Sequence, residues 1–561
     1  MLLSNLNLLA TAPDGVARLR ELILTLTVQG KLVPQDPADE PASELLKKIR
    51  SGKDRLISEG KIKRDKPLAE IAEGEKPFEL PVGWEWVRLG ATMEMFNGRA
   101  FKPTDWLASG LPIVRIQNLN KSAATFNYCD PATISEKNKI DSGSFLISWS
   151  GTPGTSFGAF IWQRGPAALN QHIFKCELLG NAFVPEFLEL SINSQLNVLI
   201  GKAQGGVGLQ HVTKGALESL VLVVPPLAEQ SRIVTRVEEL MRLCDALEAK
   251  ARLEATQHEQ LVRTLLSALT TSATPEALAD NWHRVATHFD LLLDCPEAVD
   301  AVEQTILQLA VRGLLVPQDP QDEPASVLLQ KIRLEKDRLI LEGKVKRDKP
   351  LPPIAEGDKP FDLPQGWEWT QLVEVALRGP TNGLSPKPQE LPTDVRCLSL
   401  SATTQGFFKP NCFKYVDVTS KAAEQFFLKT EDLLIQRGNS LDYVGIAAIY
   451  DCRDDAFIYP DLMMRLQLSR SVNTAFIHMA LICAEGRSYF QRNATGTQGT
   501  MPKVNQATVA GAPIPFPPLA EQSRIVARVA SLRALCADLR QRLTTARSQQ
   551  TLLAEALVEN V

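Results

Sequence analysis

The feature that most constrains this chain is an internal duplication. Residues 225–234, PPLAEQSRIV, recur without a change at 517–526. Residues 30–86 also match 313–369, with 44 of the 57 positions identical. Such a period is far longer than the roughly 20–50 residues of solenoid repeats. The chain is therefore two half-proteins in tandem, and we expect an internal pseudo-twofold repeat.

Each copy of the decapeptide opens a long helix whose apolar residues are spaced by alternating four and three positions. This heptad spacing is typical of a coiled coil. The alternative is a pair of amphipathic helices buried in separate cores. The seam residues are Ile233, Val237, Leu240, Cys244 and Leu247 in the first helix, and Ile525, Val529, Leu532, Cys536 and Leu539 in the second, with a weaker continuation to Leu553 and Leu557.

A helical region precedes each long variable segment. Its second helix is expected to start at Ser43 or Ser326, since serine is a good N-cap. A basic cluster follows in each half, and either it grips phosphates or a partner, or it is a solvated charge run. The clusters are Lys61, Lys63, Arg64 and Lys66, and Lys344, Lys346, Arg347 and Lys349. The tryptophans of the two GWEW motifs, at 83–86 and 366–369, are expected to anchor a core.

Between these repeated parts lie two segments that do not resemble one another. Both contain short strand patterns, turns and one late helix, which indicates mixed α/β (α+β) domains of ordinary size. The chain then divides into an N-terminal helical region (1–80), a first insert (81–224), a central helix (225–270), a linker with the repeated helical region (271–363), a second insert (364–516) and a C-terminal helix (517–561).

The composition limits the functions that this chain can have. The net charge is -4, and the inserts are almost neutral, so any nucleic-acid binding must use local patches or a basic partner. The nine cysteines are scattered singly without CxxC or metal-ligand spacing. There is no apolar run long enough for a membrane span and no visible secretory signal. We therefore expect a cytoplasmic protein with reduced cysteines.

Motifs for catalysis are missing. The sequence has no GxxxxGK[ST] phosphate loop, no HExxH, no [DNS]PP[YFW] tetrapeptide and no glycine-rich cradle for a methyl donor. His172, His211 and His478 lie in the inserts without an evident catalytic partner. We expect no catalytic residue, no metal and no cofactor in this chain.

The inserts instead carry loops rich in glycine and hydrogen-bonding side chains. Arg, Asn and Gln can pair with purine edges, while Ser, Thr and Lys position phosphates. The candidate DNA-binding residues are Arg99, Lys102, Arg115, Gln117, Asn118, Ser150, Thr152, Asn170, Gln171, His172, Lys202 and Gln204 in the first insert, and Arg396, Arg437, Asn439, Ser440, Tyr443, Thr497, Gln498, Lys503 and Asn505 in the second.

With these features the sequence resembles the DNA-specificity (S) subunits of type I restriction–modification enzymes over essentially its whole length. The resemblance rests on the duplicated PPLAEQxRIV helix, the GWEW entry to each insert, and insert phrases such as 110–116 (GLPIVRI) and 437–440 (RGNS). The long region before the first GWEW motif departs from many members of the family. For Met1 to Lys76 we expect a role in docking a methyltransferase.

The resemblance implies two target recognition domains separated by a long antiparallel coiled coil, each reading one half of an asymmetric bipartite DNA site. It also implies a non-catalytic chain in a phage-defence complex. Two methyltransferase subunits would bring S-adenosylmethionine and methylate adenine, and motor-nuclease restriction subunits would use ATP and Mg. Three alternatives stay open: a protein-interaction scaffold with two diverged ligand-binding domains, a fused enzyme, and a transcription regulator.

Overall fold

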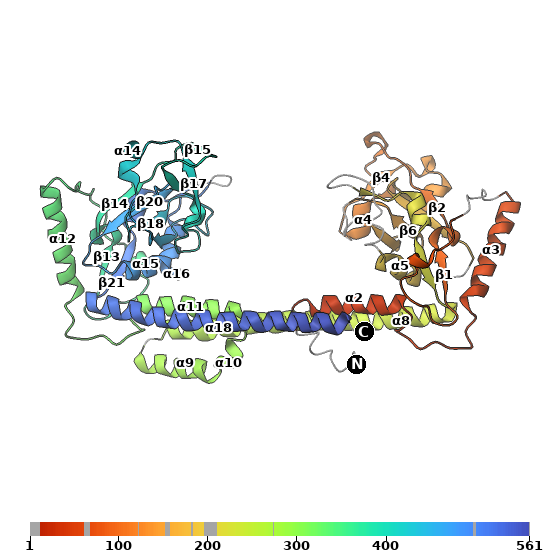
Figure 1. The fold of residues 1–561 in the computed structure, drawn as a ribbon, viewed down its shortest axis with the longest axis horizontal. Coiled ribbons are helices and arrows are strands. Elements are labelled where there is room, and N and C mark those ends of the chain that lie inside the picture. The colour runs from red at the N-terminus through yellow and green to blue at the C-terminus, as the bar shows by residue number, and fades with distance from the viewer. Residues whose placement is uncertain are drawn as a thin grey trace. The chain divides into compact units, whose positions relative to one another are not determined.

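The structure, a computed structural model, describes residues 12–60, 68–121, 123–151, 157–180, 183–195, 210–272, 274–496 and 501–559. The chain forms two compact units, Met1–Leu253 with Arg547–Val561, and Glu254–Ala546. The long helices α8 (Leu227–Thr270) and α18 (Leu519–Glu559) each contribute to both units, as the ribbon in Figure 1 allows the reader to follow. Each unit thus joins a repeated helical region, an insert and part of each long helix. In the described ranges no helix combines the length and apolarity that crossing a bilayer requires.

The first unit is built on an antiparallel sheet in the order β2-β10-β6-β8 and a second sheet, β4-β3-β9-β5, in which β3 and β9 are parallel. The short pairs β1–β12 and β7–β11 accompany them. The strands are β1 (Glu85–Arg88), β2 (Met93–Asn97), β3 (Leu111–Val114), β4 (Asn127–Cys129), β5 (Lys139–Ile140), β6 (Phe145–Ser148), β7 (Ser150–Gly151), β8 (Gly158–Ile161), β9 (Ala167–Leu169), β10 (Ile173–Leu178), β11 (Gln210–His211) and β12 (Val221–Val224). The helices are α2 (Gly15–Val28), α3 (Ala42–Ser58), α4 (Ile116–Asn120), α5 (Pro185–Ser194) and α7 (Lys214–Glu218), with 3-10 turns at Glu73–Glu75, Leu89–Ala91, Pro103–Asp105, Pro131–Thr133 and Glu136–Asn138.

The second unit repeats this core with an antiparallel sheet in the order β14-β20-β18-β19, beside the smaller sheet β15-β17-β16 and the pair β13–β21. The strands are β13 (Glu368–Gln371), β14 (Ala376–Asn382), β15 (Pro388–Gln389), β16 (Arg396–Leu398), β17 (Phe413–Val416), β18 (Leu433–Gln436), β19 (Ala447–Ile449), β20 (Met463–Leu468) and β21 (Pro513–Phe516). The helices are α9 (Pro275–Thr287), α10 (Phe289–Leu292), α11 (Pro296–Val311), α12 (Ala325–Leu341), α13 (Leu372–Val375), α14 (Ser420–Ala423), α15 (Thr474–Ile482), α16 (Ala484–Arg492) and α17 (Gln506–Ala510), with 3-10 turns at Glu356–Asp358, Leu400–Ala402 and Glu424–Phe426.

The two inserts therefore share a fold that their sequences hide. Both main sheets place the first strand beside the last and the second strand beside the third, and both lead into a helix, α5 or α15, after the last strand. Each insert is closed by a two-stranded antiparallel pair, in which Glu85 lies opposite Val224 and Glu368 lies opposite Phe516. The mixed α/β class expected from the sequence is confirmed, and the pseudo-twofold repeat extends into the inserts.

The predicted seam residues face inward. Ile233, Val237 and Cys244 are buried in the first unit, as are Ile525, Val529 and Cys536 in the second, while the leucines between them are partly buried. Within the first unit the α8 residues share a core with α2 and with Ala554 of α18. Within the second unit Leu539 of α18 packs against the cluster formed by Val262, Leu266 and Leu269 of α8. Helix α8 begins in the first unit and ends in the second, and α18 does the reverse. This agrees with antiparallel pairing of the two helices.

The seam is not made by the long helices alone. In the first unit Arg20 of α2 pairs with Asp245 of α8 at 2.6 Å, and Arg18 pairs with Glu555 of α18 at 2.5 Å. In the second unit Arg540 of α18 pairs with Asp300 of α11 at 2.6 Å. The first helix of each repeated region thus lies along the long helices (Figure 1). This gives α2 and α11 a structural role that the heptad pattern does not predict.

Two local expectations are wrong. Ser43 and Ser326 are not N-caps, because α3 and α12 begin one residue earlier and Pro41 and Pro324 occupy the cap position. Proline tolerates this place because it lacks the N–H that a helix leaves unpaired there. Leu553 does not continue the seam, since it is 50% exposed, whereas Ala554 is fully buried. One long helix drifts in phase relative to a strict heptad, and the small alanine takes the inward position.

Candidate nucleic-acid interface

The repeated decapeptide fastens each insert to the repeated helical region. Glu229 is 1% exposed, and its carboxylate accepts hydrogen bonds from Trp84 Nε1 at 3.0 Å and Gln35 Nε2 at 3.2 Å. The second half repeats this arrangement with Glu521, Trp367 and Gln318 at the same distances. In each half the glutamate of the helix start and the tryptophan expected to anchor a core therefore belong to one buried polar cluster.

The next motif residues extend the attachment. Gln230 accepts the backbone N–H of Val184, at the entrance to α5, at 2.8 Å, and Gln522 accepts that of Asn473, at the entrance to α15, at 2.9 Å. Arg232 and Arg524 pair with Asp39 and Asp322, each at 2.6 Å. Since Gln230 and Gln522 bind backbone, they can hold inserts of different sequence at the same point.

The pH dependence of this cluster has a definite sign. Burial raises the pKa of Glu229 and Glu521, although the Trp and Gln hydrogen bonds act in the opposite direction. Each carboxyl therefore contributes most below the unfolded-state pKa of about 4.3, and this contribution is lost as the pH rises through the folded-state pKa.

We expect the free energy of unfolding to fall more steeply between pH 4.5 and 7 in the wild type than in the E229Q/E521Q variant. Each of the two amides also removes one hydrogen bond at every pH, at a cost of about 1 kcal/mol per site, so the slope is the diagnostic quantity. Denaturant midpoints at both pH values measure it. Parallel curves would contradict the prediction.

In the second insert, two polar loops meet at one end of the main sheet. Arg437 to Ser440 follow β18, and Lys503 lies between Gly438 and Thr495 in short antiparallel bridges. The N–H of Asn439 donates to the carbonyl of Pro502 at 3.3 Å, and the N–H of Val504 donates to that of Arg437 at 2.8 Å. Lys503 and Ser440 are exposed at this place, and Tyr443 is 42% exposed.

The first insert brings together the corresponding loops. Ser150 follows β6 in chain order as Gly438 follows β18, and its backbone pairs with His211 in the β7–β11 bridge. Beside it, His172 lies against the ring of Trp149, with centroids 5.6 Å apart. Gln171 is exposed next to them. In both inserts the loop after the second strand of the main sheet therefore meets the segment before the last short helix, α7 or α17.

Other predicted residues are used inside the domain. Asn118 is fully buried, and its amide donates to the carbonyls of Ala124 and Thr125, both at 3.2 Å. Arg99 donates to the carbonyl of Thr133 at 2.9 Å and lies over the Phe101 ring. Asn505 caps α17 through the N–H of Thr508 at 2.8 Å. These contacts give the three side chains structural roles.

The remaining predicted residues are scattered or not described. Arg396 lies over the rings of Phe413 and Phe457, away from the 437–440 loop in the chain. Lys102 and Gln117 are exposed, Arg115 and Asn170 are partly buried, and Asn439 donates to Gln436 Oε1 at 2.7 Å. Thr152, Lys202, Gln204, Thr497 and Gln498 lie outside the described residues. DNA contact by any of these side chains stays a prediction.

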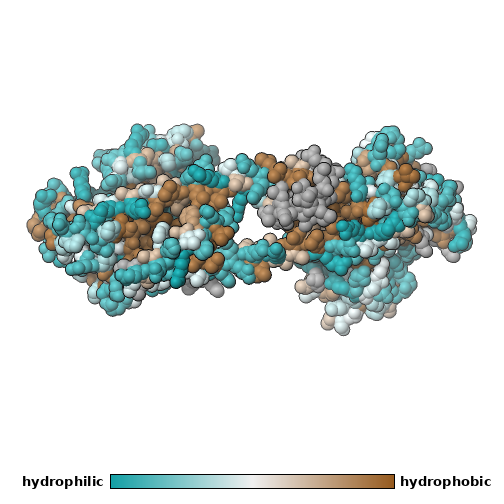
Figure 2. Space-filling model, turned by 90° about the horizontal axis from the view of Figure 1, so that it is seen from below, coloured by the Kyte–Doolittle hydropathy of each residue, from teal (hydrophilic) through white to brown (hydrophobic). Residues whose placement is uncertain are grey.

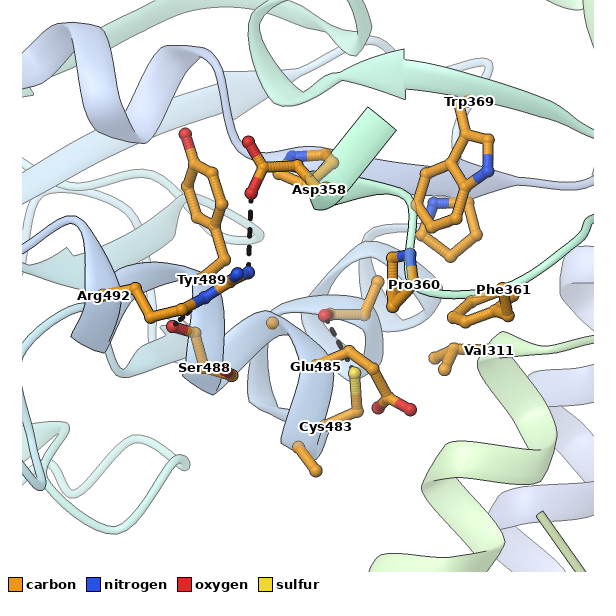
Figure 3. Close-up of a pocket in the computed structure, with 16 residues that line it drawn as sticks. Val311, Asp358, Pro360, Phe361, Trp369, Cys483, Glu485, Ser488, Tyr489 and Arg492 are labelled. Atoms are coloured by element: carbon orange, nitrogen blue, oxygen red, sulfur yellow. Dashed lines mark hydrogen bonds and ion pairs between the residues drawn. The ribbon is translucent and has the colours of Figure 1, made fainter. Parts of the chain in front are cut away.

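A pocket marks the junction between repeated frame and insert in the second unit. It has a volume of about 340 Å³ and lies between the segment 357–361, Trp369 and helix α16. Figure 3 shows Arg492 directed at Asp358, at 3.4 Å, and Phe361 on the opposite wall. Glu485 pairs with Arg312 at the end of α11 at 2.8 Å. Two ion pairs thus hold α16 against the frame.

Chemistry-bearing side chains meet at one further place. Ligand atoms of His258, Asp294 and Cys295 lie within 4.8 Å of one another, a proximity that their spacing in the sequence does not indicate. His258 Nε2 is 3.1 Å from the carbonyl of Leu291 and 3.3 Å from Asp294. These contacts join the turn between α10 and α11 to α8. His478 lies in the second insert, and its Nε2 is 3.1 Å from the carbonyl of Ala447, as expected for a structural histidine.

Sequence reasoning missed the polar residues that attach the inserts. Glu229, Gln230 and their counterparts were identical in both halves, which was the available signal. Arg378 and Arg465 beside the basic cluster of the second half were also missed. They lie in the non-repeated insert, where the sequence gives no sign that the fold brings them to that cluster.

This chain is similar in sequence to proteins of a known family. The model of the type I restriction modification DNA specificity domain matches the chain twice, over residues 81–257 and 364–546. The EcoEI type I restriction enzyme specificity subunit of Escherichia coli is 33% identical, with 97% of this chain and 93% of the relative aligned. The EcoAI specificity subunit of Escherichia coli is 35% identical with the same coverage.

A chain from a solved structure on complex assembly and conformational transition of a type I R-M system is 18% identical, covers 86% of this chain and 98% of its own length, and has a TM-score of 0.47. The alignments with the two Escherichia coli subunits leave out only a small part of the chain, so they include most of residues 1–80, and this region is shared with them. The two family matches together span more than half of the sequence. The chain belongs to the family of type I restriction–modification DNA specificity subunits.

Proposed function

We propose that each insert is a target recognition domain that reads one half of an asymmetric, bipartite site in duplex DNA. The observation that carries this proposal is the equivalent placement of two dissimilar sets of polar loops. The loops after β6 and β18 follow equivalent strands of the two main sheets but carry different side chains. Bases are distinguished by the donors and acceptors on their edges, so equivalent loops with different side chains suit two different half-sites.

The chain would act as the specificity component of a larger complex. Two methyltransferase subunits would carry S-adenosylmethionine and methylate adenine, and motor-nuclease subunits with ATP and Mg would restrict unmodified DNA in the cytoplasm, so that this chain performs no chemistry itself. Exposed apolar side chains support assembly with other subunits. Trp282 and Leu291 on α9 and α10 are 52% and 72% exposed, and Figure 2 shows apolar residues on the surface of this unit from below.

Single-molecule sequencing of adenine methylation, in a host that expresses this chain with its methyltransferase, tests the proposal. We expect one motif made of two different half-sites separated by a constant number of unread base pairs. A contiguous or palindromic motif would refute the asymmetric assignment. If the complex assembles but binds the methylated motif no better than a scrambled duplex, the scaffold alternative is favoured.

The spacer length should depend on the two long helices. α8 passes from the first unit to the second after Leu253, and α18 returns after Ala546. Seven residues added at both places would lengthen the pair by about 10.5 Å, which corresponds to about three base pairs. We expect the methylated motif to gain about three spacer base pairs with both half-sites unchanged. An unchanged spacer in an active complex would contradict the ruler role.

A further inference from the structure

A basic hollow of about 600 Å³ lies in the second unit where the repeated frame meets the insert. Lys344, Lys346 and Arg347 from the frame line one side, and Arg378 of β14 and Arg465 of β20 line the other. Asp348 is the carboxylate among the lining residues. A chain with a net charge of -4 therefore concentrates five cationic side chains around one open hollow.

The charges of this hollow are not all neutralised internally. Asp348 pairs with Lys336, outside the hollow. Lys344 pairs with Glu342 at 2.7 Å, and Arg465 lies 3.8 Å from Asp432. Arg465 also donates to the carbonyls of Phe427 and Gln425 at 2.8 and 3.1 Å, so it helps to build the wall. Lys346 and Arg347 are exposed, and neither makes an ion pair or hydrogen bond with another described residue.

The insert and the frame are joined at the floor of the hollow. Arg378 Nη2 donates to the backbone carbonyl of Lys344 at 3.0 Å. This hydrogen bond holds the basic loop beside the strand β14, so Lys346 and Arg347 are presented from an anchored backbone. The anchor reduces the backbone entropy that the loop loses when it binds an anion.

We propose that this hollow binds phosphates of the DNA backbone, outside the base-reading loops. The inference rests on the proposed function and assigns a site to the basic cluster whose role the sequence left open. Lys344, Lys346 and Arg347 have identical counterparts in Lys61, Lys63 and Arg64. Residues that are the same in both halves cannot distinguish two different half-sites. A sequence-independent phosphate is therefore the ligand that fits them.

The test is the K346A/R347A variant in complex with the methyltransferase, titrated against a duplex carrying the methylated motif and against a scrambled duplex. Two lost phosphate contacts should reduce the slope of log affinity against log salt by about 2. At 50 mM salt both duplexes should bind about tenfold more weakly, and by 200 mM the difference should nearly vanish. The ratio between motif and scrambled duplex should not change.

The matched control is R333A/R528A, which removes two exposed arginines from α12 and α18. We expect it to bind both duplexes with the wild-type salt slope. If the wild-type complex prefers its motif but K346A/R347A keeps the wild-type slope, the hollow is not a phosphate site, although the recognition function stands. If K346A/R347A no longer assembles with the methyltransferase, the hollow is a protein contact and the proposal is overturned. A wild-type complex without motif preference would refute the proposed function itself.

Discussion

Replacing Trp367 by alanine is expected to destabilise the second unit by about 3–5 kcal/mol. Trp367 is 6% exposed, and its ring meets Phe476 of α15 edge-on with centroids 6.0 Å apart. Its Nε1 donates to the buried Glu521 at 3.0 Å. The variant thus loses apolar burial and leaves one carboxylate oxygen without its donor, which itself costs about 1–3 kcal/mol.

Hydrogen exchange of the full chain, followed by mass spectrometry, measures this effect. Peptides from α15 and β21 should exchange faster in W367A, because their opening free energy falls with the stability of the unit. Peptides from β6 and β10 of the first unit should keep their protection. W84A should give the reverse pattern, since Trp84 makes the corresponding bond to Glu229 at 3.0 Å.

The control is Trp282→Ala, which removes the same side chain from the same unit at a site that is 52% exposed. Surface substitutions of this kind usually change stability by about 0.5 kcal/mol or less. If W367A and W282A exchange alike, the Trp–Glu cluster does not hold the insert in place.

A chain with two copies of the second insert is expected to methylate a palindromic site. Residues 372–512 would replace residues 89–220, because Leu89 and Leu372 occupy equivalent places and donate to the carbonyls of Leu220 and Ala512 at 2.8 and 2.9 Å. Gln230 would then accept the backbone N–H that Gln522 accepts now. Position 29 is equivalent to position 312. The substitution Gln29→Arg would therefore give the transplanted Glu485 the ion-pair partner that it has in Arg312 of the second unit.

The motif should change to two inverted copies of the second half-site. Each wrong base pair costs about 1–3 kcal/mol, so binding to the original motif should fall at least about a hundredfold. Sequencing of methylated DNA gives the motif, and chromatography with the methyltransferase shows that the chimera assembles. If an assembled chimera still methylates the original motif, recognition by the inserts is contradicted.

The sequence was most informative where residues repeat. The repeated decapeptide and the heptad spacing that follows it predicted the two long helices, and the repeated motifs contributed to the resemblance to specificity subunits. The mixed class of the inserts was predicted instead from strand and turn patterns inside segments that do not repeat. Periodicity also predicted the burial of Ile233 and Ile525, because a helix that buries one face needs apolar residues at that spacing. The candidate loops were predicted only in part. Arg437 and Lys503 do come together, whereas Asn118 is buried within the first insert.

What the sequence by itself determined is the constant frame, since its polar and apolar residues recur in one register. The tertiary structure alone revealed that the two inserts share one sheet topology, because many different apolar side chains can fill the same antiparallel core. It also decided what the repeated polar residues do. Glu229 and Gln230 find their partners 145 and 46 residues away in the chain, and local spacing carries no trace of contacts over such distances.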